Sequence, residues 1–278
     1  MLKNTEDISK IAIIVILYNP KNIVCNNIKT YANYADKLIL VDNSENNNLY
    51  IAQMFSNSIY IPLYKNYGIA KAINIGCDTA IKQNCQWIIT MDQDSSFFND
   101  IITKYKVRLA LNDIGMLIPY YSYDRTNKKL LQDRTVKLAM QSAAMISTKV
   151  YKQVGPYEEK LFIDGVDYDY CYRIRKKGYK ILQCHDAILQ HSPAETKQIK
   201  YFCCTFKYGI ASPVRYYYQS RNLLYLLFKY KDLKILVIWL YKLFKICFLF
   251  PKKTKYIYFF FKGIKDFITK NFGIYHEK

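Results

Sequence analysis

Mainly apolar runs alternate with stretches of helical character in the first third of the chain. The runs cover residues 11–17, 37–41, 58–61 and 87–91. Apolar runs of this length, without a polar residue at every second position, are typical of parallel strands that are covered on both faces. Helical stretches at about 22–35 and at 70–82 separate them. The pattern predicts an α/β fold with a mostly parallel central sheet flanked by helices.

The end of the chain has a different pattern. From residue 223 onward, aliphatic, aromatic and Lys residues alternate at roughly helical spacing. The charge-free run at 235–241 lies between Lys234 and Lys242, whereas a bilayer span needs about 20 apolar residues. We therefore predict no transmembrane helix. We divide the chain into an α/β domain at 1–215 and a basic, aromatic-rich amphipathic helical tail at 216–278.

The same two parts of the chain also differ in net charge. The 278 residues include 41 Lys and Arg against 22 Asp and Glu, which gives a net charge of +19, and +14 of it lies in residues 197–278. Only seven of the basic residues are Arg. Lys suits general attraction to an anionic surface better than base-specific reading of DNA. The composition of the tail therefore predicts that it binds an anionic membrane surface and no nucleic acid. The alternative is that it packs on the domain or on a second copy in a homodimer.

Cysteine usage indicates the compartment. The eight cysteines are scattered through apolar stretches and include no Cys-x-x-Cys pair, and the first residues contain no apolar signal segment. A chain of this size does not need disulfides to fold. We expect a reduced, cytoplasmic protein.

Two of the predicted strands run directly into carboxylates. Asp42 follows the run at 37–41, and Asp92 and Asp94 follow the run at 87–91. In an open α/β sheet, ligands bind outside the carboxyl ends of the strands, so both loops should face one crevice. Two adjacent like charges need a cation, and oxygen ligands suit Mg²⁺ or Mn²⁺ holding a diphosphate. The alternative is a turn or a helix cap.

Residues 65–76 lie between these two loops. Gly68 precedes the helical stretch at 70–82, and the free N–H groups at a helix start suit an anion. Asn66 and Asn74 are polar residues in an otherwise packing-rich segment. By itself this segment is a weak indication of phosphate binding, because the chain contains no Walker-type phosphate loop.

A third acidic segment holds Asp164, Asp167 and Asp169, followed by Arg173. If a helix begins near Asp167, then Asp169 and Arg173 form an i,i+4 pair. One interpretation is therefore a capped, salt-bridged helix. The other is a general base at Asp167, since a carboxylate at a helix start beside aromatic residues is fixed in position and partly desolvated.

The ordered set of motifs resembles glycosyltransferase family 2, which has the GT-A fold, and within it the bacterial rhamnosyltransferase-like members. The resemblance covers roughly residues 10–225. It rests on Leu17-Tyr-Asn19, Val41-Asp-Asn-Ser44, Asn66-Tyr-Gly-Ile-Ala70, Asn74-Ile-Gly76, Met91-Asp-Gln-Asp-Ser95, the segment 162–173, Lys177-Gly-Tyr179, His191 and Tyr217-Tyr-x-x-x-Arg-Asn222. The Asp-Gln-Asp-Ser segment and the Phe-Ile-Asp-x-Val-Asp segment indicate rhamnosyl transfer.

The resemblance implies roles for individual residues. Asp167 is the expected catalytic base. Nucleotide-sugar binding is expected of Asn19, Asp42, Asn66, Gly68, Asn74, Asp92 and Arg221. The metal ligands are expected to be Asp92, Asp94 and His191, and the acceptor side is expected to include Gln141, Ser142 and Asp164. Gln141-Ser142-Ala143 stands where many relatives carry Ser-Gly, and Val166 replaces the first acidic residue of the common Glu-Asp pair, so the acceptor is less certain than the catalysis.

The activity implied by the resemblance is an inverting, metal-dependent transfer of a sugar, with Mg²⁺ or Mn²⁺ as cofactor. The expected donor is dTDP-L-rhamnose, and the expected acceptor is a hydroxyl of a lipid-linked bacterial surface glycan at the inner face of the plasma membrane. Three alternatives stay open: a UDP-hexose donor, a sugar nucleotidyltransferase, and a non-catalytic membrane-binding scaffold. A nucleotidyltransferase should carry a Gly-rich phosphate loop after the first strand, where this chain has Tyr18-Asn19-Pro20.

Overall fold

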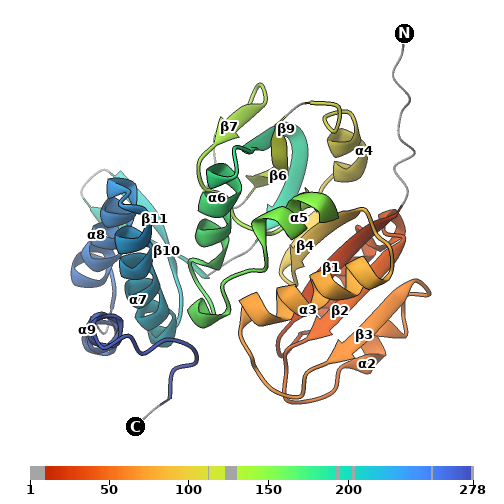
Figure 1. Ribbon diagram of the computed structural model, residues 1–278. Helices are drawn as coiled ribbons and strands as arrows, with labels where there is room; N and C mark the ends of the chain where they lie inside the picture. The colour runs from red at the N-terminus through yellow and green to blue at the C-terminus, as the bar shows by residue number, and fades with distance from the viewer. Residues whose placement is uncertain are drawn as a thin grey trace.

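The computed structural model describes residues 10–111, 113–122, 130–191, 195–201, 204–251 and 253–276. The first part of the chain alternates strands and helices (Figure 1). Its elements are β1 (Ile11–Leu17), α1 (Ile23–Lys29), a 3₁₀ turn (Ala32–Tyr34), β2 (Lys37–Asp42), α2 (Leu49–Ala52), β3 (Ser58–Pro62), α3 (Ile69–Lys82) and β4 (Trp87–Asp92). All four strands predicted from apolar runs are confirmed, and so is the helix at 70–82.

The helix expected over about 22–35 is shorter than predicted. It ends at Lys29, where the Thr30 hydroxyl donates a hydrogen bond to the carbonyl of Asn27, 2.6 Å away. The chain then enters the 3₁₀ turn Ala32–Tyr34, and Tyr31 before it is completely buried.

The middle of the chain extends the same sheet. Its elements are β5 (Ser95–Phe97), α4 (Ile101–Lys106), β6 (Ile114–Ser122), β7 (Arg134–Val136), β8 (Ala144–Ser147), α5 (Thr148–Val154), a 3₁₀ turn (Glu159–Leu161), α6 (Val166–Lys176) and β9 (Lys180–His191). The strand order is β3-β2-β1-β4-β8-β6-β9-β5, with β7 paired to β9. Every residue of β1 is buried at the centre of the parallel part.

The sheet is mixed rather than mostly parallel. Strands β3, β2, β1 and β4 are parallel to one another, whereas β8 is antiparallel to both of its neighbours, β4 and β6. A parallel connection needs a long crossover, usually helical. Between β6 and β8 the described residues contain only the short strand β7, so β8 returns in the opposite direction. The predicted parallel pairing is therefore present among the N-terminal four strands and between β6 and β9, while the other described pairs are antiparallel.

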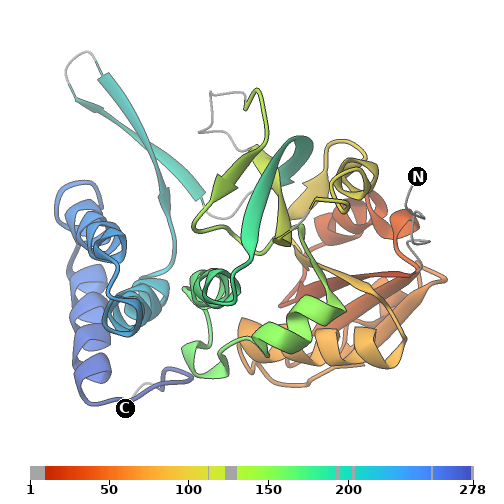
Figure 2. The same cartoon turned by 45° about the horizontal axis from the view of Figure 1, so that its top comes forward.

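The last part of the chain forms a hairpin and three helices. These are β10 (Glu195–Tyr201), β11 (Cys204–Ile210), α7 (Pro213–Tyr230), α8 (Leu233–Phe248) and α9 (Lys253–Ile268). The hairpin projects away from the main body, and the three helices lie side by side next to the α/β domain (Figure 2). The helical tail is confirmed, while the hairpin was not predicted. Residue 215, the predicted domain boundary, lies inside α7.

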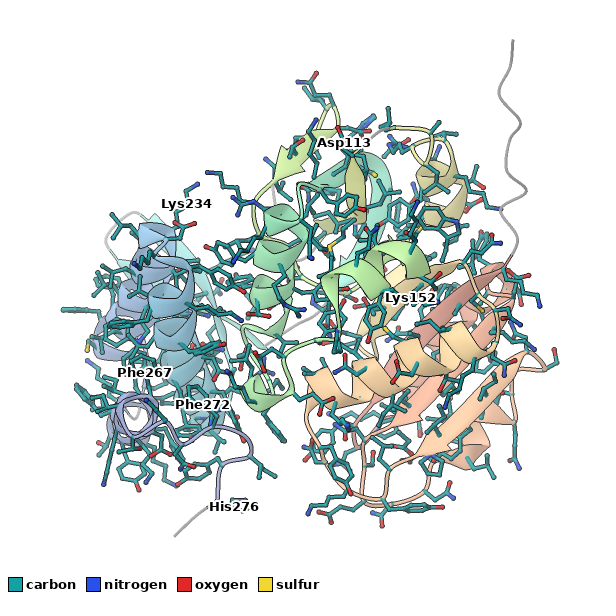
Figure 3. The ribbon with its side chains drawn as sticks, viewed as in Figure 1. Asp113, Lys152, Lys234, Phe267, Phe272 and His276 are labelled. Carbon is teal, nitrogen blue, oxygen red and sulfur yellow. The ribbon has the colours of Figure 1, made fainter. Side chains whose placement is uncertain are left out.

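Helix α7 is bonded directly to the α/β domain. The Nδ2 atom of Asn222 lies 2.8 Å from the carbonyl oxygens of three residues of the loop before α6, namely Leu161, Ile163 and Asp164. The segment after α9 returns to the same region, because Phe272 packs on Tyr225 of α7 with ring centroids 5.4 Å apart (Figure 3). The division into two domains stays a prediction about folding units.

Two glycines allow helices to approach their neighbours closely. A Cβ on Gly76 of α3 would lie 2.4 Å from Ile14 of β1, and one on Gly263 of α9 would lie 2.4 Å from the backbone oxygen of Tyr217 in α7. Glycine is therefore needed where α3 covers the sheet and where α9 covers α7. Among the helices described, none combines the length and apolar character that crossing a membrane requires.

Candidate active site

A cavity of about 530 Å³ lies between the carboxyl ends of β1 and β4, the N-terminus of α6, and helices α7 and α8. Eight of the predicted site residues line it. These are Asn66, Gly68, Asp92, Asp94, Gln141, Asp164, Asp167 and His191. Residues up to 125 positions apart, from Asn66 to His191, therefore meet around one cavity at the carboxyl ends of the strands.

Asp92, Asp94 and His191 form the group best suited to a metal ion. One ligand atom from each side chain lies within 4.8 Å of the others, and the Nδ1 atom of His191 lies 3.3 Å from Asp94. Two carboxylates and an imidazole are a donor set that Mn²⁺ and Mg²⁺ accept. The residues therefore fit the predicted metal.

The sheet holds this group in place. Strand β5 pairs with β9 so that Ser95 lies opposite His191, and the Ser95 hydroxyl is 2.7 Å from the Nδ1 atom of that histidine. Ser142 donates to the Ser95 hydroxyl at 2.8 Å and accepts the N–H of Asp92 at 3.2 Å. Ser142 is fully buried and does not line the cavity, so its place is behind the metal ligands rather than on the acceptor side.

The charges of this group perturb one another. Burial raises the pKa of Asp92, and the nearby charge of Asp94 raises it further. Burial alone would lower the pKa of His191, but its hydrogen bond to Asp94 and the two carboxylate charges give a net increase. The pKa of Asp92 is thus raised by burial and by the like charge of Asp94, whereas that of His191 is raised by the opposite charges of the two carboxylates. A divalent cation would relieve the repulsion between the two carboxylates.

A second group of two Asp residues and one His residue lies elsewhere in the structure, and unlike the first group it is paired with an arginine. Asp133, His185 and Asp186 also come together, but Arg108 contacts both carboxylates at 2.6 and 2.7 Å. Burial opposes ionisation of Asp133, yet hydrogen bonds from Arg108 and His185 lower its pKa well below the usual value. The group is thus an ion-pair network that already contains its cation.

Asp167 lies in the first turn of α6 and lines the cavity. Its carboxylate accepts the N–H of Tyr168 at 2.9 Å. Burial, together with the charges of Asp164 and Asp92, raises the pKa of Asp167 to about 7, against the lowering effect of that hydrogen bond. A carboxylate with a pKa near neutrality is suited to accept a proton in this pH range.

Asp169 has a structural role, as the capped-helix interpretation predicted. Its side chain is fully buried, pairs with Arg173 at 2.8 Å and with Lys229 of α7 at 2.7 Å, and accepts the hydroxyl of Tyr230. The two interpretations of the acidic segment therefore apply to different residues, with Asp169 holding α6 to α7 and Asp167 facing the cavity.

Asp164 is paired with a residue that the sequence analysis missed. The guanidinium of Arg215 donates two hydrogen bonds to it, at 2.5 and 2.7 Å, and the Nε2 atom of Gln219 lies 3.4 Å from it. Arg215 and Gln219 both line the cavity. Since both are on α7, more than 50 residues after Asp164, only the fold brings them to the site.

Asparagines position the loop before α3. Asn43 of the loop after β2, also missed by the sequence analysis, donates to Asn66 at 3.0 Å and accepts the N–H of Tyr67 at 2.8 Å. Gly68 has a φ of +85°, and a Cβ there would lie 2.6 Å from the carbonyl oxygen of Phe162. That carbonyl accepts the N–H of Ile69 at 2.7 Å, so one N–H group at the start of α3 is bonded to protein.

Four residues expected to bind the nucleotide sugar do not line the cavity. Asn74 and Arg221 are 4% and 0% exposed, and their polar atoms bond to protein groups such as Tyr157 and Leu161. These two residues are corrected to positioning roles, because neither side chain has access to the cavity. Asn19 and Asp42 directly adjoin residues that do line it, and donor binding by them stays a prediction.

Comparisons with known proteins identify the family of the chain. The profile described as Glycosyl transferase family 2 matches residues 12–162. The chain is 29% identical over 245 residues to a protein named dTDP-rhamnosyl transferase RfbF from Shigella flexneri, covering 80% of this chain and 81% of that protein. This similarity supports the rhamnosyltransferase-like subgroup.

Two solved structures have the same fold. S. aureus TarS 1-349 in complex with UDP-GlcNAc has a TM-score of 0.60 at 15% identity, covering 94% of this chain and 81% of that one. GalNAc-T7 with UDP, GalNAc and Mn2+ has a TM-score of 0.56 at 13% identity, covering 67% of this chain and 44% of that one.

The matched profile spans more than half of the chain and contains Asp42, Asp92 and Asp94, and the cavity joins these loops to α6. The predicted α/β fold of GT-A type agrees with both structural comparisons. The chain belongs to glycosyltransferase family 2 and is a rhamnosyltransferase-like member of it.

Proposed function

We propose that this glycosyltransferase moves L-rhamnose from dTDP-L-rhamnose to a hydroxyl of a lipid-linked glycan, with inversion at the anomeric carbon. The observation that carries the proposal is the position of Asp167. A single carboxylate with a pKa of about 7 lines the same cavity as Asp92, Asp94 and His191. An inverting transferase needs one base for the acceptor and one group for the leaving diphosphate.

The donor side of the cavity is formed by the N-terminal part of the chain. Asn43, Asn66, Gln93 and Asp94 line it at the carboxyl ends of the parallel strands, where α/β sheets bind nucleotides. Asp92, Asp94 and His191 would hold the metal. When bound, Mg²⁺ or Mn²⁺ supplies positive charge that stabilises the departing nucleoside diphosphate.

The reaction we propose is one displacement. The oxygen of the acceptor hydroxyl attacks the anomeric carbon on the face opposite the diphosphate, the bond between that carbon and the diphosphate oxygen breaks, and dTDP leaves. The proton of the hydroxyl passes to the carboxylate of Asp167. Because the attack and the departure occur on opposite faces, a β-linked donor gives an α-linked product, and no covalent intermediate with the protein is formed.

The tail supplies the surface that we propose for membrane contact. Six exposed apolar residues recur along α8 at helical spacing, and they are Leu233, Val237, Leu240, Tyr241, Phe244 and Phe248. Exposed lysines of α8 and α9, including Lys234, Lys255 and Lys265, accompany them. An apolar helix face flanked by Lys is suited to lie in the headgroup region of an anionic membrane.

Donor choice tests the proposed function. Purified protein with Mn²⁺ should release dTDP from dTDP-L-rhamnose at least ten times faster than it releases UDP from UDP-glucose, UDP-galactose or UDP-N-acetylglucosamine. The measurement is nucleoside diphosphate release with each donor at the same concentration. A faster rate with any UDP-sugar would contradict the proposed donor.

The pH profile and substitution of Asp167 test the base. Asp167→Asn should lower turnover by about 100-fold or more, because general-base catalysis contributes on this scale, while binding of dTDP should be unchanged. Asp78→Asn, at an exposed position of α3, is the control. In the wild type, kcat/KM should rise with pH and level off above about 7, because only the ionised carboxylate accepts the proton. A profile that is flat from pH 5 to 8 would exclude this assignment.

Metal dependence follows from the group at Asp92, Asp94 and His191. Chelation with EDTA should abolish activity and added Mn²⁺ should restore it. Asp94→Ala and His191→Ala should each raise the Mn²⁺ concentration for half-maximal activity by at least tenfold. His185→Ala is the matched control, since His185 lies in the group that already contains Arg108. Full activity in EDTA would contradict the metal proposal.

Membrane contact by α8 is tested with two double variants. Leu240→Ser with Phe244→Ser should weaken binding to phosphatidylglycerol vesicles by at least tenfold, whereas Val107→Ser with Leu131→Ser, exposed residues elsewhere, should leave it unchanged. Wild-type binding should decrease with salt and be weaker on phosphatidylcholine. Equal loss in both double variants would contradict this surface. If the wild type instead forms a dimer and does not bind vesicles, and the α8 variant is a monomer, the exposed apolar face of α8 would be assigned to contact with a second copy.

A further inference from the structure

Two glutamines in the wall of the cavity have amide groups that are only partly satisfied. Gln141, in the loop before β8, and Gln219 of α7 both line the cavity, and each is 8% exposed. The Nε2 atom of Gln141 donates a hydrogen bond to Asp92 at 3.4 Å, and that of Gln219 donates one to Asp164 at the same distance. In both residues the amide oxygen is buried and has no hydrogen-bond partner among the residues that the structure describes.

The orientation of each amide follows from its carboxylate neighbour. An ionised carboxylate only accepts hydrogen bonds, so the NH₂ group of the amide must face it and the amide oxygen is left over. A flipped amide would place its oxygen against a charged oxygen. A buried oxygen without a partner costs free energy, because it has lost its hydrogen bonds to water and gained none. Each glutamine therefore offers one acceptor for a hydroxyl group of a ligand.

The backbone of Gln141 is fixed to the end of β4. The hydroxyl of Thr90 and the N–H of Ala144 donate hydrogen bonds to the carbonyl of Gln141 at 2.6 and 2.9 Å, and the N–H of Ala143 donates to the carbonyl of Thr90 at 2.7 Å. The side chain of Gln141 is held by one long hydrogen bond only. Because the terminal torsion of a glutamine is broad, a small rotation of the amide turns its oxygen toward a ligand without moving the backbone.

Gln141 lies between the metal group and the base. Its amide is bonded to Asp92, and a second, smaller pocket is lined by both Gln141 and Asp167. In the proposed displacement, the anomeric carbon lies between the departing diphosphate on the metal side and the hydroxyl that Asp167 deprotonates. The transferred sugar is bonded directly to the diphosphate, so it belongs in the part of the cavity that Gln141 borders. Gln219 differs, because it lies beside the ion pair of Asp164 and Arg215.

We propose that Gln141 is a specificity-determining residue for the donor, and that its amide oxygen accepts a hydrogen bond from a ring hydroxyl of the transferred sugar. This rests on the proposed function, because it takes Asp92 as a metal ligand and Asp167 as the base. The L-rhamnosyl group has hydroxyls at C2, C3 and C4, so three candidates exist. A sugar without the bonded hydroxyl leaves the amide oxygen unpaired and is bound more weakly. Gln141, which the resemblance places on the acceptor side, is thereby assigned to the donor sugar.

The first test compares a ligand that contains the sugar with one that does not. Gln141→Met keeps the length of the side chain and removes the amide. Calorimetry of the full-length protein with Mn²⁺ should show that the variant binds dTDP-L-rhamnose at least tenfold more weakly than wild type, because a buried hydrogen bond is lost. Its Kd for dTDP should stay within twofold of wild type. Gln53→Met, at an exposed position after α2, is the matched control and should leave both Kd values unchanged.

The second test identifies the partner hydroxyl with the 2-deoxy, 3-deoxy and 4-deoxy analogues of dTDP-L-rhamnose. For one analogue, wild type should lose at least tenfold in affinity relative to dTDP-L-rhamnose, whereas Gln141→Met should lose less than twofold, because its side of the hydrogen bond is already absent. For the other two analogues, wild type and variant should lose affinity by equal factors. Equal losses in wild type and variant for all three analogues would overturn the proposal. Each comparison is made within one protein, so a general loss of affinity in the variant does not affect it.

Other roles of Gln141 give different results. If Gln141 only positions Asp92, Gln141→Met should raise the Mn²⁺ concentration needed for dTDP binding at least tenfold, without any difference between the proteins in their response to the analogues. If Gln141 contacts the acceptor, the affinity for dTDP-L-rhamnose should not change. Either result would overturn the proposal.

Failure of this proposal and failure of the proposed function are separable. A wild type that binds dTDP-L-rhamnose but responds to all three analogues as Gln141→Met does refutes the role of Gln141 alone. A wild type that binds a UDP-sugar more tightly than dTDP-L-rhamnose refutes the proposed donor, and the comparison of wild type with Gln141→Met is then made on the deoxy analogues of that UDP-sugar.

Discussion

The active site depends on how the loop before α6 is held. Phe162 and Asp164 have φ angles of +64° and +61°, a left-handed conformation that non-glycine residues adopt only when their surroundings enforce it. The surroundings here are Asn222 of α7, 2.8 Å from three carbonyl oxygens of residues 161–164, and Ile69 of α3, whose N–H bonds to Phe162. The same loop leads directly into the first turn of α6, so these bonds fix where Asp167 lies.

The loop also explains why the two ends of the chain are interdependent. Its position requires glycine at residue 68 on the N-terminal side, and it receives Asn222 and Arg215 from the C-terminal side. Helix α7 therefore contributes to the geometry around the base although it comes after the residues matched by the family profile. Helices α8 and α9 pack on α7, and the segment after α9 returns to the 3₁₀ turn, where the N–H of Gly273 donates a hydrogen bond to the carbonyl of Lys160. A change in the tail thus reaches the catalytic cavity through α7.

The sequence alone predicted those features that depend on residues close together in the chain. Apolar runs identified β1 to β4, and the carboxylates that follow strands identified Asp92 and Asp94, because a parallel sheet brings its carboxyl ends together. Residues missed by the sequence analysis act across long separations. Arg215 pairs with Asp164 some 50 positions earlier, and nothing around it distinguishes it from a surface arginine. A polar residue in an otherwise packing-rich segment was also a poor guide to ligand binding, because buried amides stabilise the fold as readily as they bind a ligand. Asn74, for example, holds the backbone of Tyr157 from inside α3.

The two faces of helix α8 meet different surroundings. Residues 237, 240, 241, 244 and 248 are exposed and apolar, whereas Ile238, Lys242 and Lys245 face the cavity. In a soluble helix that packs on a protein, the apolar residues would face inward and the lysines outward. Here the arrangement is partly reversed, because a lysine is buried beside the cavity while phenylalanines are exposed. The exposure of these large apolar side chains is costly in water, and an outer face that meets an apolar phase removes that cost.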